Sequence, residues 1–336
     1  MSDSELSRLL ADLSTPDEAA RSAVRSRAAQ VLRPGGAFER LDRVAVWLAG
    51  WQGSRNPSVG RPHAILFAGD HGVAAEGVSA YPSDITAAMV AALAEGRATA
   101  SVLASQVGAS VSVVDVAVGD PTGNIRTTDA LTPERFDAAV RAGIAAVGDC
   151  DADLLVVGEM GIGNTTPAAA VAASVLGGSG LEWVGPGTGV FGEALLNKAL
   201  VVQDALERVG SVQPLEALRR LGGAELAAIA AAVMTARRRR IPVVLDGFIA
   251  TASVLPLEAE APGALQHCIA GHRSAEPGHV RLLEHLNLEP LLELDLRLGE
   301  GSGALAAVPL IRMAAAAVVE VATFEEWADH SPGPSP

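Results

Sequence analysis

The sequence predicts an α/β protein with a Rossmann-like parallel sheet that is covered by helices on both faces. Continuous aliphatic runs of strand length alternate with helical stretches through the middle of the chain, which is typical of buried parallel strands. Apolar residues make up 49% of the chain and aromatic residues only 3%, so the core must be aliphatic and finely packed. A length of 336 residues allows one large α/β domain, or a main domain with a smaller companion.

The first part of the chain, up to residue 50, predicts two or three helices. The stretch SRLLADL has helical spacing, and TPDEAARSAVRSRAAQVL begins with Thr15 as a candidate N-cap. FERLDRVAVWLAG follows a Pro-Gly-Gly break and predicts a further helix. These helices precede the part of the chain in which strands and helices alternate.

Strand-like runs follow, each succeeded by a helical stretch. We expect strands at residues 64–69, 111–118, 154–159 and 242–248, and helices at residues 85–96, 133–147, 167–177 and 249–255. In such sheets ligands bind beyond the carboxyl ends of the strands. The segments to test for a site are therefore GDHG, GEMGIGNTT, LDGF and GHRSAEPGH. The final SPGPSP, residues 331–336, predicts a disordered tail.

The charge balance excludes several classes of partner. A formal net charge of −14 argues against nucleic acid and anionic membrane, because phosphate binding needs a basic face. The basic run Arg237 to Arg240 follows an Ala-rich helical stretch, and we expect it to be a solvated helix end. Cys150 and Cys268 lie far apart without a CxxC motif, which argues against a zinc site, a disulfide scaffold and secretion.

Two further observations predict a soluble, cytoplasmic protein. The N-terminus, MSDSELSRLLADL, is acidic and amphipathic and lacks the basic start of a signal peptide. No charged residue lies between Met160 and Leu181, which is long enough for a membrane span. The Gly, Asn, Thr, Pro and Ser content of that stretch nevertheless favours a loop followed by a buried helix.

The glycine-rich segment GEMGIGNTT lies between a strand-like run and a helix. Small residues such as Gly161 and Gly163 let backbone N–H groups approach an anion at a helix N-terminus. A Walker A loop would place Lys after its last glycine, but Asn164 and Thr165 stand there. From these residues alone, a phosphate site and an ordinary strand-to-helix turn both fit.

A second glycine loop, GPGTGV, contains Gly187 and Thr188. Lys198 lies about two helical turns further on and could supply the positive charge that the first loop lacks. An exposed lysine on a helix fits the same pattern. Ser274 and its neighbouring backbone, in GHRSAEPGH, also fit a phosphate site.

Two carboxylates stand beside these glycines. Glu159 would repel phosphate, so we expect it to face a cationic or hydroxylated part of a ligand, such as ribose. Glu300 lies between glycines in LRLGEGSGA, and nearby leucines could desolvate it. Desolvation would raise the pKa of its carboxyl, which suits a general base near neutral pH. A loop glutamate that faces water is the alternative.

The histidines of the candidate segments do not predict a metal site. Asp70 and His71 follow the first strand-like run, but no second His lies at ligand spacing and no Gly-x-Ser-x-Gly motif is present. We expect both to organise their loop through hydrogen bonds. His272 and His279 are seven residues apart, which is not a metal-ligand spacing.

Together, these segments resemble the nicotinate-nucleotide:dimethylbenzimidazole phosphoribosyltransferase family. FAGDHGVAAEGVSAYP, EMGIGNTTPAAA, PVVLDGFIATAS, GHRSAEPGH and LGEGSGA occur in the family's order, and the resemblance runs from about Leu32 to about Ala316. It implies a Rossmann-like domain at residues 61–304 and a small helical domain built from residues 1–60 and 305–330. It also implies a homodimer that requires no metal or organic cofactor.

The resemblance further implies transfer of a 5-phosphoribosyl group from nicotinate mononucleotide to a nitrogen of 5,6-dimethylbenzimidazole. The products would be nicotinate and α-ribazole 5′-phosphate, for the nucleotide loop of cobalamin. One alternative is a paralogue whose acceptor is another azole, a purine or a phenol. A non-catalytic nucleotide-binding relative is the other, and the presence of both Glu159 and Glu300 argues against it.

The same resemblance implies roles for individual residues. Glu300 matches the base that removes the acceptor's N–H proton, and Glu159 matches a second carboxylate near the ribose. Ala88 stands where the family has a Gln beside the acceptor pocket, and Pro186 where it has an Arg, so the resemblance defines the acceptor less closely than the reaction. The matched nucleotide and phosphate positions are Gly161, Gly163, Asn164, Thr165, Gly187, Thr188, Lys198 and Ser274. The matched acceptor walls are Ser79, Tyr81, Ile162 and Leu298.

Overall fold

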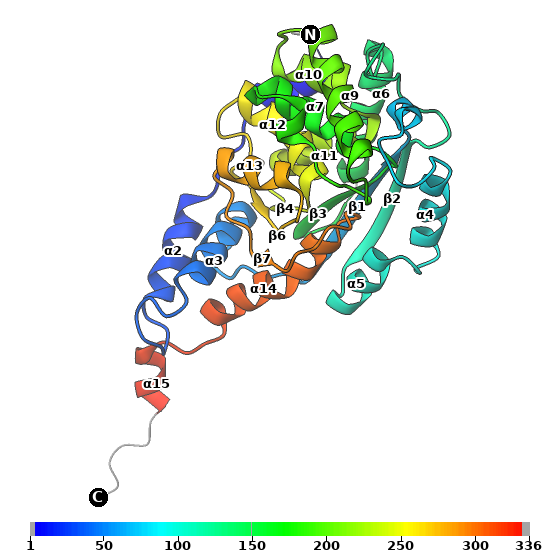
Figure 1. Ribbon diagram of the computed structural model, residues 1–336. Helices are drawn as coiled ribbons and strands as arrows, with labels where there is room; N and C mark the ends of the chain where they lie inside the picture. The colour runs from blue at the N-terminus through cyan, green and yellow to red at the C-terminus, as the bar shows by residue number, and fades with distance from the viewer. Residues whose placement is uncertain (1–3, 149, 331–336) are drawn as a thin grey trace, which may run out of the picture.

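The computed structural model describes residues 4–148 and 150–330, and the predicted tail at residues 331–336 lies outside them. Its centre is a five-stranded parallel sheet with strand order β2-β1-β3-β4-β5 (Figure 1). The predicted parallel α/β fold is confirmed. The strands are β1 (Pro62–Gly69), β2 (Ser110–Ala117), β3 (Leu154–Met160), β4 (Val243–Leu245) and β5 (Cys268–Ala270).

Three short strands are not predicted by the sequence. β5, β6 (His272–Arg273) and β7 (Leu292–Glu293) have only two or three residues each, too few for a periodic pattern. β6 and β7 pair in parallel as a separate small sheet. The fourth predicted strand is also shorter than expected, because Asp246 leaves the ladder and its side chain binds a helix N-terminus instead.

Helices cover both faces of the sheet (Figure 1). Along β1, Ile65 and Phe67 pack into a core with α6, α7, α11 and α12, whereas Ala64 and Leu66 pack with α3, α5 and α14 on the other face. This alternation is what a strand that is buried on both sides requires. The helices are α1 (Glu5–Leu10), α2 (Glu18–Ala28), α3 (Glu39–Gln52), the 3₁₀ helix η1 (Gly72–Glu76), α4 (Ile85–Ala94), α5 (Thr99–Val107), α6 (Pro133–Gly148), α7 (Thr165–Leu176), α8 (Gly180–Trp183), α9 (Glu193–Val209), α10 (Pro214–Leu221), α11 (Ala224–Arg238), α12 (Phe248–Glu260), α13 (Pro277–His285), α14 (Ser302–Val319) and α15 (Phe324–His330).

Helices from the early and late parts of the chain, α2, α3 and α14, lie together beside the sheet (Figure 1). Helices α2, α3 and α14 pack on one another, and Val31 forms an antiparallel bridge with Thr323. Arg27 donates a hydrogen bond to the carbonyl of Val318 at 2.9 Å. Helix α1 packs instead on α11 and α6. A division into residues 1–60 plus 305–330 and residues 61–304 stays a prediction.

The N-cap predicted for the second helix is wrong. The structure places Asp17, not Thr15, at the N-cap of α2, where its side chain accepts a hydrogen bond from the backbone N–H of Ala20 at 2.9 Å. A carboxylate both binds the free N–H groups and complements the positive end of the helix dipole, which a hydroxyl does less well.

The basic run at the end of α11 is only partly solvated. Arg238, Arg239 and Arg240 are exposed as expected, but Arg237 is buried. Its guanidinium lies over the ring of Trp51 at 5.2 Å and donates hydrogen bonds to the carbonyls of Ser14 and Ala264. The expectation of a solvated residue is therefore wrong for Arg237, because the planar guanidinium satisfies several buried carbonyls at once.

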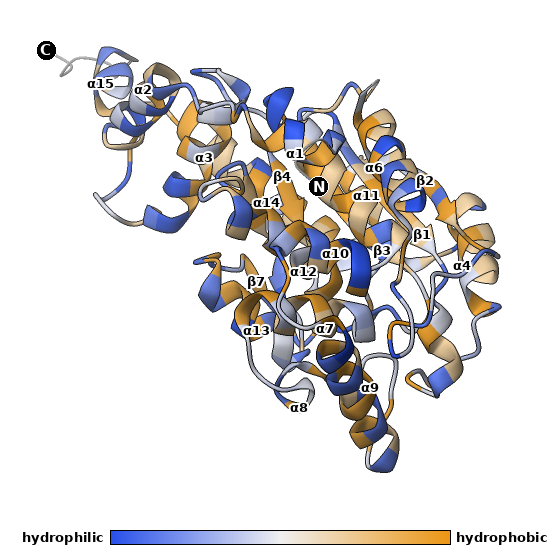
Figure 2. Cartoon of the chain, turned by 90° about the horizontal axis from the view of Figure 1, so that it is seen from above, coloured by the Kyte–Doolittle hydropathy of each residue, from blue (hydrophilic) through white to orange (hydrophobic). Residues whose placement is uncertain are grey.

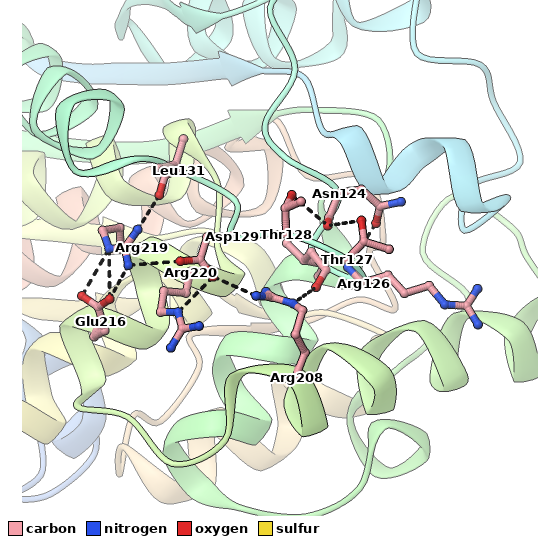
Figure 3. A network of polar contacts seen from close by, with 11 residues as sticks. Asn124, Arg126, Thr127, Thr128, Asp129, Leu131, Arg208, Glu216, Arg219 and Arg220 are labelled. Atoms are coloured by element: carbon pink, nitrogen blue, oxygen red, sulfur yellow. Dashed lines mark hydrogen bonds and ion pairs between the residues drawn. The ribbon is translucent and has the colours of Figure 1, made fainter.

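The long segment between β2 and α6 is tied to α9 and α10 by one carboxylate. Asp129 forms ion pairs with Arg208 at 2.8 Å, Arg219 at 3.2 Å and Arg220 at 2.9 Å (Figure 3). Burial alone would raise the pKa of Asp129, but the hydrogen bonds from Arg208 and Arg220 hold it below its ordinary value. A partly buried network of this kind fixes a segment that would otherwise lie loosely over the sheet.

Two helical segments are long and apolar enough to cross a membrane by length and composition alone, Ile85–Val107 and Ser302–Val319. Ser302–Val319 is mostly buried in the protein, and in Figure 2 its helix α14 is one of the hydrophobic elements around the sheet. Ile85–Val107 is not one continuous helix but α4 and α5, separated at residues 95–98. The charge-free stretch after Met160 forms a loop and the buried helix α7, as expected.

Candidate active site

Residues at or just beyond the carboxyl ends of β3, β4 and β5 line a cavity of about 400 Å³. The switch in strand order beside β1 opens the sheet at this edge, as in other doubly wound folds. The cavity is lined by Tyr81, Ile85, Met89, Glu159, Met160, Gly161, Ile162, Asn164, Thr165, Gly187, Thr188, Gly247, Phe248, Ile249, His272, Ser274, Glu276, Arg297, Leu298, Gly299 and Glu300.

Most residues proposed from the sequence meet here. Gly163, Lys198, Ser79 and Ala88 do not line the cavity. Ser79 contacts it indirectly, because its hydroxyl lies 3.0 Å from that of the lining residue Thr188. Ala88 is exposed on α4, while Ile85 and Met89 of the same helix reach the cavity. Ile85 and Met89 lie on one face of the helix at spacing i, i+4. Ala88 lies beside that face, and its side chain is too short to reach the cavity.

Glu300 sits in a turn of three consecutive left-handed residues. Its φ is 61°, between Gly299 at 85° and Gly301 at 76°. A non-glycine residue in this region is disfavoured and needs support from its surroundings. Asp246 gives that support, since it accepts hydrogen bonds from the backbone N–H groups of Gly301 at 3.1 Å and Ala304 at 2.9 Å. The end of β4 thus fixes the turn at the N-terminus of α14.

The carboxyl of Glu300 is buried and turned toward the cavity. The residue is only 4% exposed, which excludes a loop glutamate that faces water. Burial raises the pKa of Glu300, a hydrogen bond from the backbone of Ala100 opposes the shift, and the charge of Asp246 adds to it. Its Oε2 has no hydrogen-bond partner within the described part of the chain, so it is available to a ligand.

Glu159 is the second carboxylate of the cavity, at the end of β3. Burial raises its pKa to about 8, although the side-chain amide of Asn164 donates a hydrogen bond to Oε2 and opposes the shift. The charges of Glu225, Asp246 and Glu300 raise the pKa further. Near neutral pH and without a ligand, Glu159 is therefore mainly the acid, ready to ionise beside a cation.

Lys198 lies behind the cavity wall. It is buried in α9, and its Nζ donates hydrogen bonds to Thr165 Oγ1 at 2.8 Å and to the carbonyl of Gly185 at 2.9 Å. Burial lowers its pKa to about 8, while Glu276 acts in the opposite direction. This geometry excludes an exposed lysine on a helix and joins the two glycine loops around one cation.

Thr165, Gly187, Lys198 and Ser274 form what we call the anion cradle. A Cβ on Gly187 would lie 3.1 Å from Lys198 Nζ and 3.0 Å from Thr165 Oγ1, so only a glycine leaves that space open. Ser274 reaches the cavity from the loop between β6 and α13. The buried His279 accepts a hydrogen bond from the Ser274 backbone N–H at 3.1 Å, and its Nδ1 lies 2.9 Å from the Ser274 hydroxyl.

The opposite side of the cavity is apolar. Ile162 is buried, whereas Tyr81 and Leu298 stand at the rim and are 54% exposed each. Ile85 and Met89 extend this apolar wall. The sequence does not point to these two, because apolar residues on a helix are indistinguishable from core residues until the helix is placed.

Asp70 and His71 lie outside the cavity and organise its base. Asp70 accepts a hydrogen bond from the Gly119 backbone at 2.8 Å, and His71 Nε2 lies 2.6 Å from Glu225 Oε1 in a fully buried pair. A Cβ on Gly161 would come within 2.6 Å of the Gly69 carbonyl. These contacts agree with the loop-organising role expected for both residues.

Within residues 4–148 and 150–330, no group of three or more His, Cys, Asp or Glu side chains is arranged to hold a metal ion. His272 and His279 contact each other edge to face, with ring centroids 5.9 Å apart. Their packing is that of neighbouring buried rings.

The chain is similar to known proteins over most of its length. The model of a phosphoribosyltransferase family matches residues 13–328. A nicotinate-nucleotide–dimethylbenzimidazole phosphoribosyltransferase from Cereibacter sphaeroides is 50% identical over 316 residues, 94% of this chain and 93% of that protein. One of the same name from Methylorubrum extorquens is 47% identical over 313 residues, 92% and 91% of the two chains. A crystal structure of CobT from Thermus thermophilus superposes with a TM-score of 0.89 at 42% identity, covering 94% of this chain and all of that one.

Proposed function

This chain belongs to the phosphoribosyltransferase family, and we propose that it transfers the 5-phosphoribosyl group of nicotinate mononucleotide to 5,6-dimethylbenzimidazole. The products are α-ribazole 5′-phosphate and nicotinate, and the step serves assembly of the nucleotide loop of cobalamin. One observation carries the proposal. The cavity holds a buried carboxyl, Glu300, with a raised pKa and an unpartnered oxygen, fixed in a left-handed turn.

Glu300 acts as the general base. One nitrogen of the acceptor attacks C1′ of the ribose, and the bond from C1′ to the pyridinium nitrogen breaks. Its electron pair stays on that nitrogen, so nicotinate leaves with a neutral ring and needs no acid. The proton on the acceptor's other nitrogen passes to the Glu300 carboxylate, whose raised pKa suits it to hold a proton near neutral pH. Attack opposite the leaving group inverts C1′ from β to α.

Glu159 stabilises the positive charge that develops on the ribose. Without a ligand, its pKa of about 8 keeps it largely protonated. A cationic pyridinium or an oxocarbenium-like C1′ lowers that pKa, so the carboxyl ionises where the charge appears. The hydrogen bond from Asn164 holds one of its oxygens in place.

The anion cradle binds the 5′-phosphate. Lys198 supplies the charge, while Thr165, Ser274 and the backbone N–H of Gly187 supply directional donors. The N-terminus of α7 adds its dipole. A phosphate fixed here and a base fixed at Glu300 place C1′ between them, which lowers the entropic part of the barrier.

The acceptor lies against the apolar wall of Tyr81, Ile162 and Leu298, extended by Ile85 and Met89. A flat apolar base such as dimethylbenzimidazole suits this surface. A larger or more polar acceptor is the second candidate, because Ala88 replaces the family's Gln and leaves the exposed side of α4 uncovered.

We propose a homodimer in the cytoplasm. β2 is an edge strand, and Val111, Val113 and Val114 are only half-buried in the single chain. The neighbouring α4 and α5 expose further apolar surface, including Val102 at 50%. An uncovered strand edge beside apolar helices is a surface that a second copy would protect. Sedimentation velocity tests the dimer, and a monomer at micromolar concentration would contradict it.

The reaction is tested by incubating the protein with nicotinate mononucleotide and a panel of bases while nicotinate release is followed. Release with dimethylbenzimidazole, and α-ribazole 5′-phosphate in the product, is expected. Release only with another azole, adenine or a phenol would assign the paralogue's activity. Tight nucleotide binding without release from any acceptor would leave a non-catalytic binding protein.

A further inference from the structure

The anion cradle already contains a carboxylate of its own chain. Glu276 lies in the loop between β6 and α13, lines the cavity and is buried. Its Oε1 accepts a hydrogen bond from the backbone N–H of Gly187 at 2.8 Å. Its Oε2 is also buried, yet it has no hydrogen-bond partner in the described ranges. Its charge acts on Lys198 as an attraction.

This contact conflicts with phosphate binding. The Gly187 N–H is one of the donors assigned to the 5′-phosphate, and a single N–H cannot serve two anions well. A phosphate dianion and a carboxylate side by side would also repel each other strongly in a site shielded from water. The carboxylate must therefore leave Gly187 before a phosphate can occupy the cradle.

We propose that Glu276 occupies the anion cradle of the unliganded enzyme and that the incoming 5′-phosphate displaces it. The inference rests on the proposed function, since it takes Gly187 and Lys198 as phosphate ligands. Glu276 is then a residue that determines which anions the enzyme binds. A small free anion gains only its contacts with the cradle residues. The free energy needed to displace Glu276 offsets that gain.

A phosphate carried by a nucleotide is in a different position. Its ribose and aromatic ring fill the rest of the cavity and gain contacts of their own, so the whole ligand displaces Glu276 at a much lower concentration than inorganic phosphate or sulfate does. The occupied cradle also keeps Lys198 beside an anion when substrate is absent, because its ammonium is otherwise buried among neutral groups. The hydrogen bond between Glu276 and Gly187 also holds the Gly185 to Val190 loop in place when substrate is absent.

The test is a Glu276→Gln variant, with inorganic sulfate as the probe in calorimetry at pH 7. Glutamine keeps an oxygen for the Gly187 N–H but removes the competing charge. We expect sulfate to bind about 10-fold to 100-fold more tightly than to the unchanged protein. Glu284→Gln is the matched control, since Glu284 lies on α13, is exposed and does not line the cavity. Unchanged or weaker sulfate binding in Glu276→Gln would overturn the proposal.

Two further measurements locate the sulfate. In a Glu276→Gln, Lys198→Met double variant the gain should disappear, and if it persists, sulfate binds elsewhere and the proposal fails. Crystals of the unchanged protein soaked in concentrated sulfate should show Glu276 withdrawn from Gly187. Sulfate beside Lys198 with the Gly187 contact intact would overturn displacement even if the variant does not fold.

The outcomes also separate this inference from the proposed reaction. Turnover of nicotinate mononucleotide with no effect of Glu276→Gln on sulfate would leave the reaction standing and remove the role of Glu276. Tighter sulfate binding by Glu276→Gln in a protein that turns over no acceptor would keep the role of Glu276 and contradict the proposed reaction.

Discussion

Replacing Glu300 by glutamine tests the proposed base most directly. Glutamine has nearly the same shape and tolerates the left-handed φ of 61° as well as glutamate does, so the turn should remain intact. Folding should not suffer either, because the substitution removes a buried carboxyl whose pKa is raised and whose Oε2 has no partner among residues 4–148 and 150–330. A lost activity would therefore report on chemistry.

The expected loss in kcat is about 100-fold to 10,000-fold, the usual contribution of a general base, or about 3–5 kcal/mol in the barrier. The structure argues against rescue by the neighbouring carboxyl. Glu159 faces the positive charge of the ribose in the proposed mechanism and one of its oxygens is held by Asn164, so it is not placed to take the acceptor's proton in place of Glu300. The KM for nicotinate mononucleotide should change little, because Glu300 lies on the acceptor side.

The assay is nicotinate release with saturating dimethylbenzimidazole, measured from pH 5 to 9. Because the raised pKa of Glu300 must be exceeded for the base form, kcat should rise with pH in the unchanged protein, and this rise should be missing in the variant. Glu284→Gln is again the control and should behave like the unchanged protein. A Glu300→Gln enzyme with undiminished kcat and the same pH profile would refute the mechanism.

The further predictions concern three other residues, Lys198, Asp246 and Glu159. Lys198 has a pKa lowered to about 8, so it is a cation below that pH and neutral above it. Because a neutral lysine attracts the phosphate less, the KM for nicotinate mononucleotide should rise above about pH 8. Lys198→Met should raise that KM about 10-fold to 100-fold at pH 7 without affecting the KM for the unphosphorylated riboside, and an equal effect on both substrates would argue against phosphate binding. Asp246→Ala removes the acceptor of two buried N–H groups, so it should lower the free energy of unfolding in urea by about 1–3 kcal/mol and should also lower kcat. A fully active variant would show that the turn around Glu300 does not depend on Asp246. Glu159→Gln should raise stability at pH 8 by about 1–4 kcal/mol while activity falls, and equal stability of the two proteins across pH 5 to 8 would contradict the raised pKa.

The sign of the last prediction follows from burial. The folded pKa of Glu159, about 8, lies above the ordinary value of 4.5, so the folded protein binds a proton more tightly than the unfolded chain does. The stabilising contribution of the Glu159 proton to the free energy of unfolding is therefore complete below pH 4.5 and declines as the pH rises toward 8. Glutamine does not titrate and removes this decline.

The sequence predicts the parallel sheet well because β1 and β3 are buried on both faces and therefore read as uninterrupted apolar runs. The same reasoning places the site at the strand ends, where Gly161, Asp246 and Gly271 come next in the chain. Local pattern is enough for these features, since each depends on residues that are near one another in sequence.

Contacts between distant segments could not be predicted in this way. Arg237 is buried only because Trp51 and the carbonyls of Ser14 and Ala264 surround it, and nothing in the local run of arginines distinguishes it from Arg238. The carboxylate of Glu276 in the anion cradle is a similar case. Its partner, Gly187, lies in another glycine loop 89 residues away, so the contact appears only once both loops are placed.

The acidic residues around the cavity are all buried at a cost in stability. Glu159, Asp246 and Glu300 are buried, and burial raises the pKa of each, so without a ligand they lower stability as the pH increases. Residues selected for stability alone would be apolar in place of Glu159 and Glu300. Asp246 offsets part of the penalty by binding the N-terminus of α14, and the Asn164 amide offsets part of it for Glu159, but Glu300 Oε2 has no partner in the described part of the chain. The unphosphorylated riboside of nicotinate carries the pyridinium and the ribose but not the phosphate assigned to Lys198, so it should stabilise the fold more at pH 8.5 than at pH 6. A thermal shift that is the same at pH 6 and pH 8.5 would mean that these carboxyls do not ionise on binding.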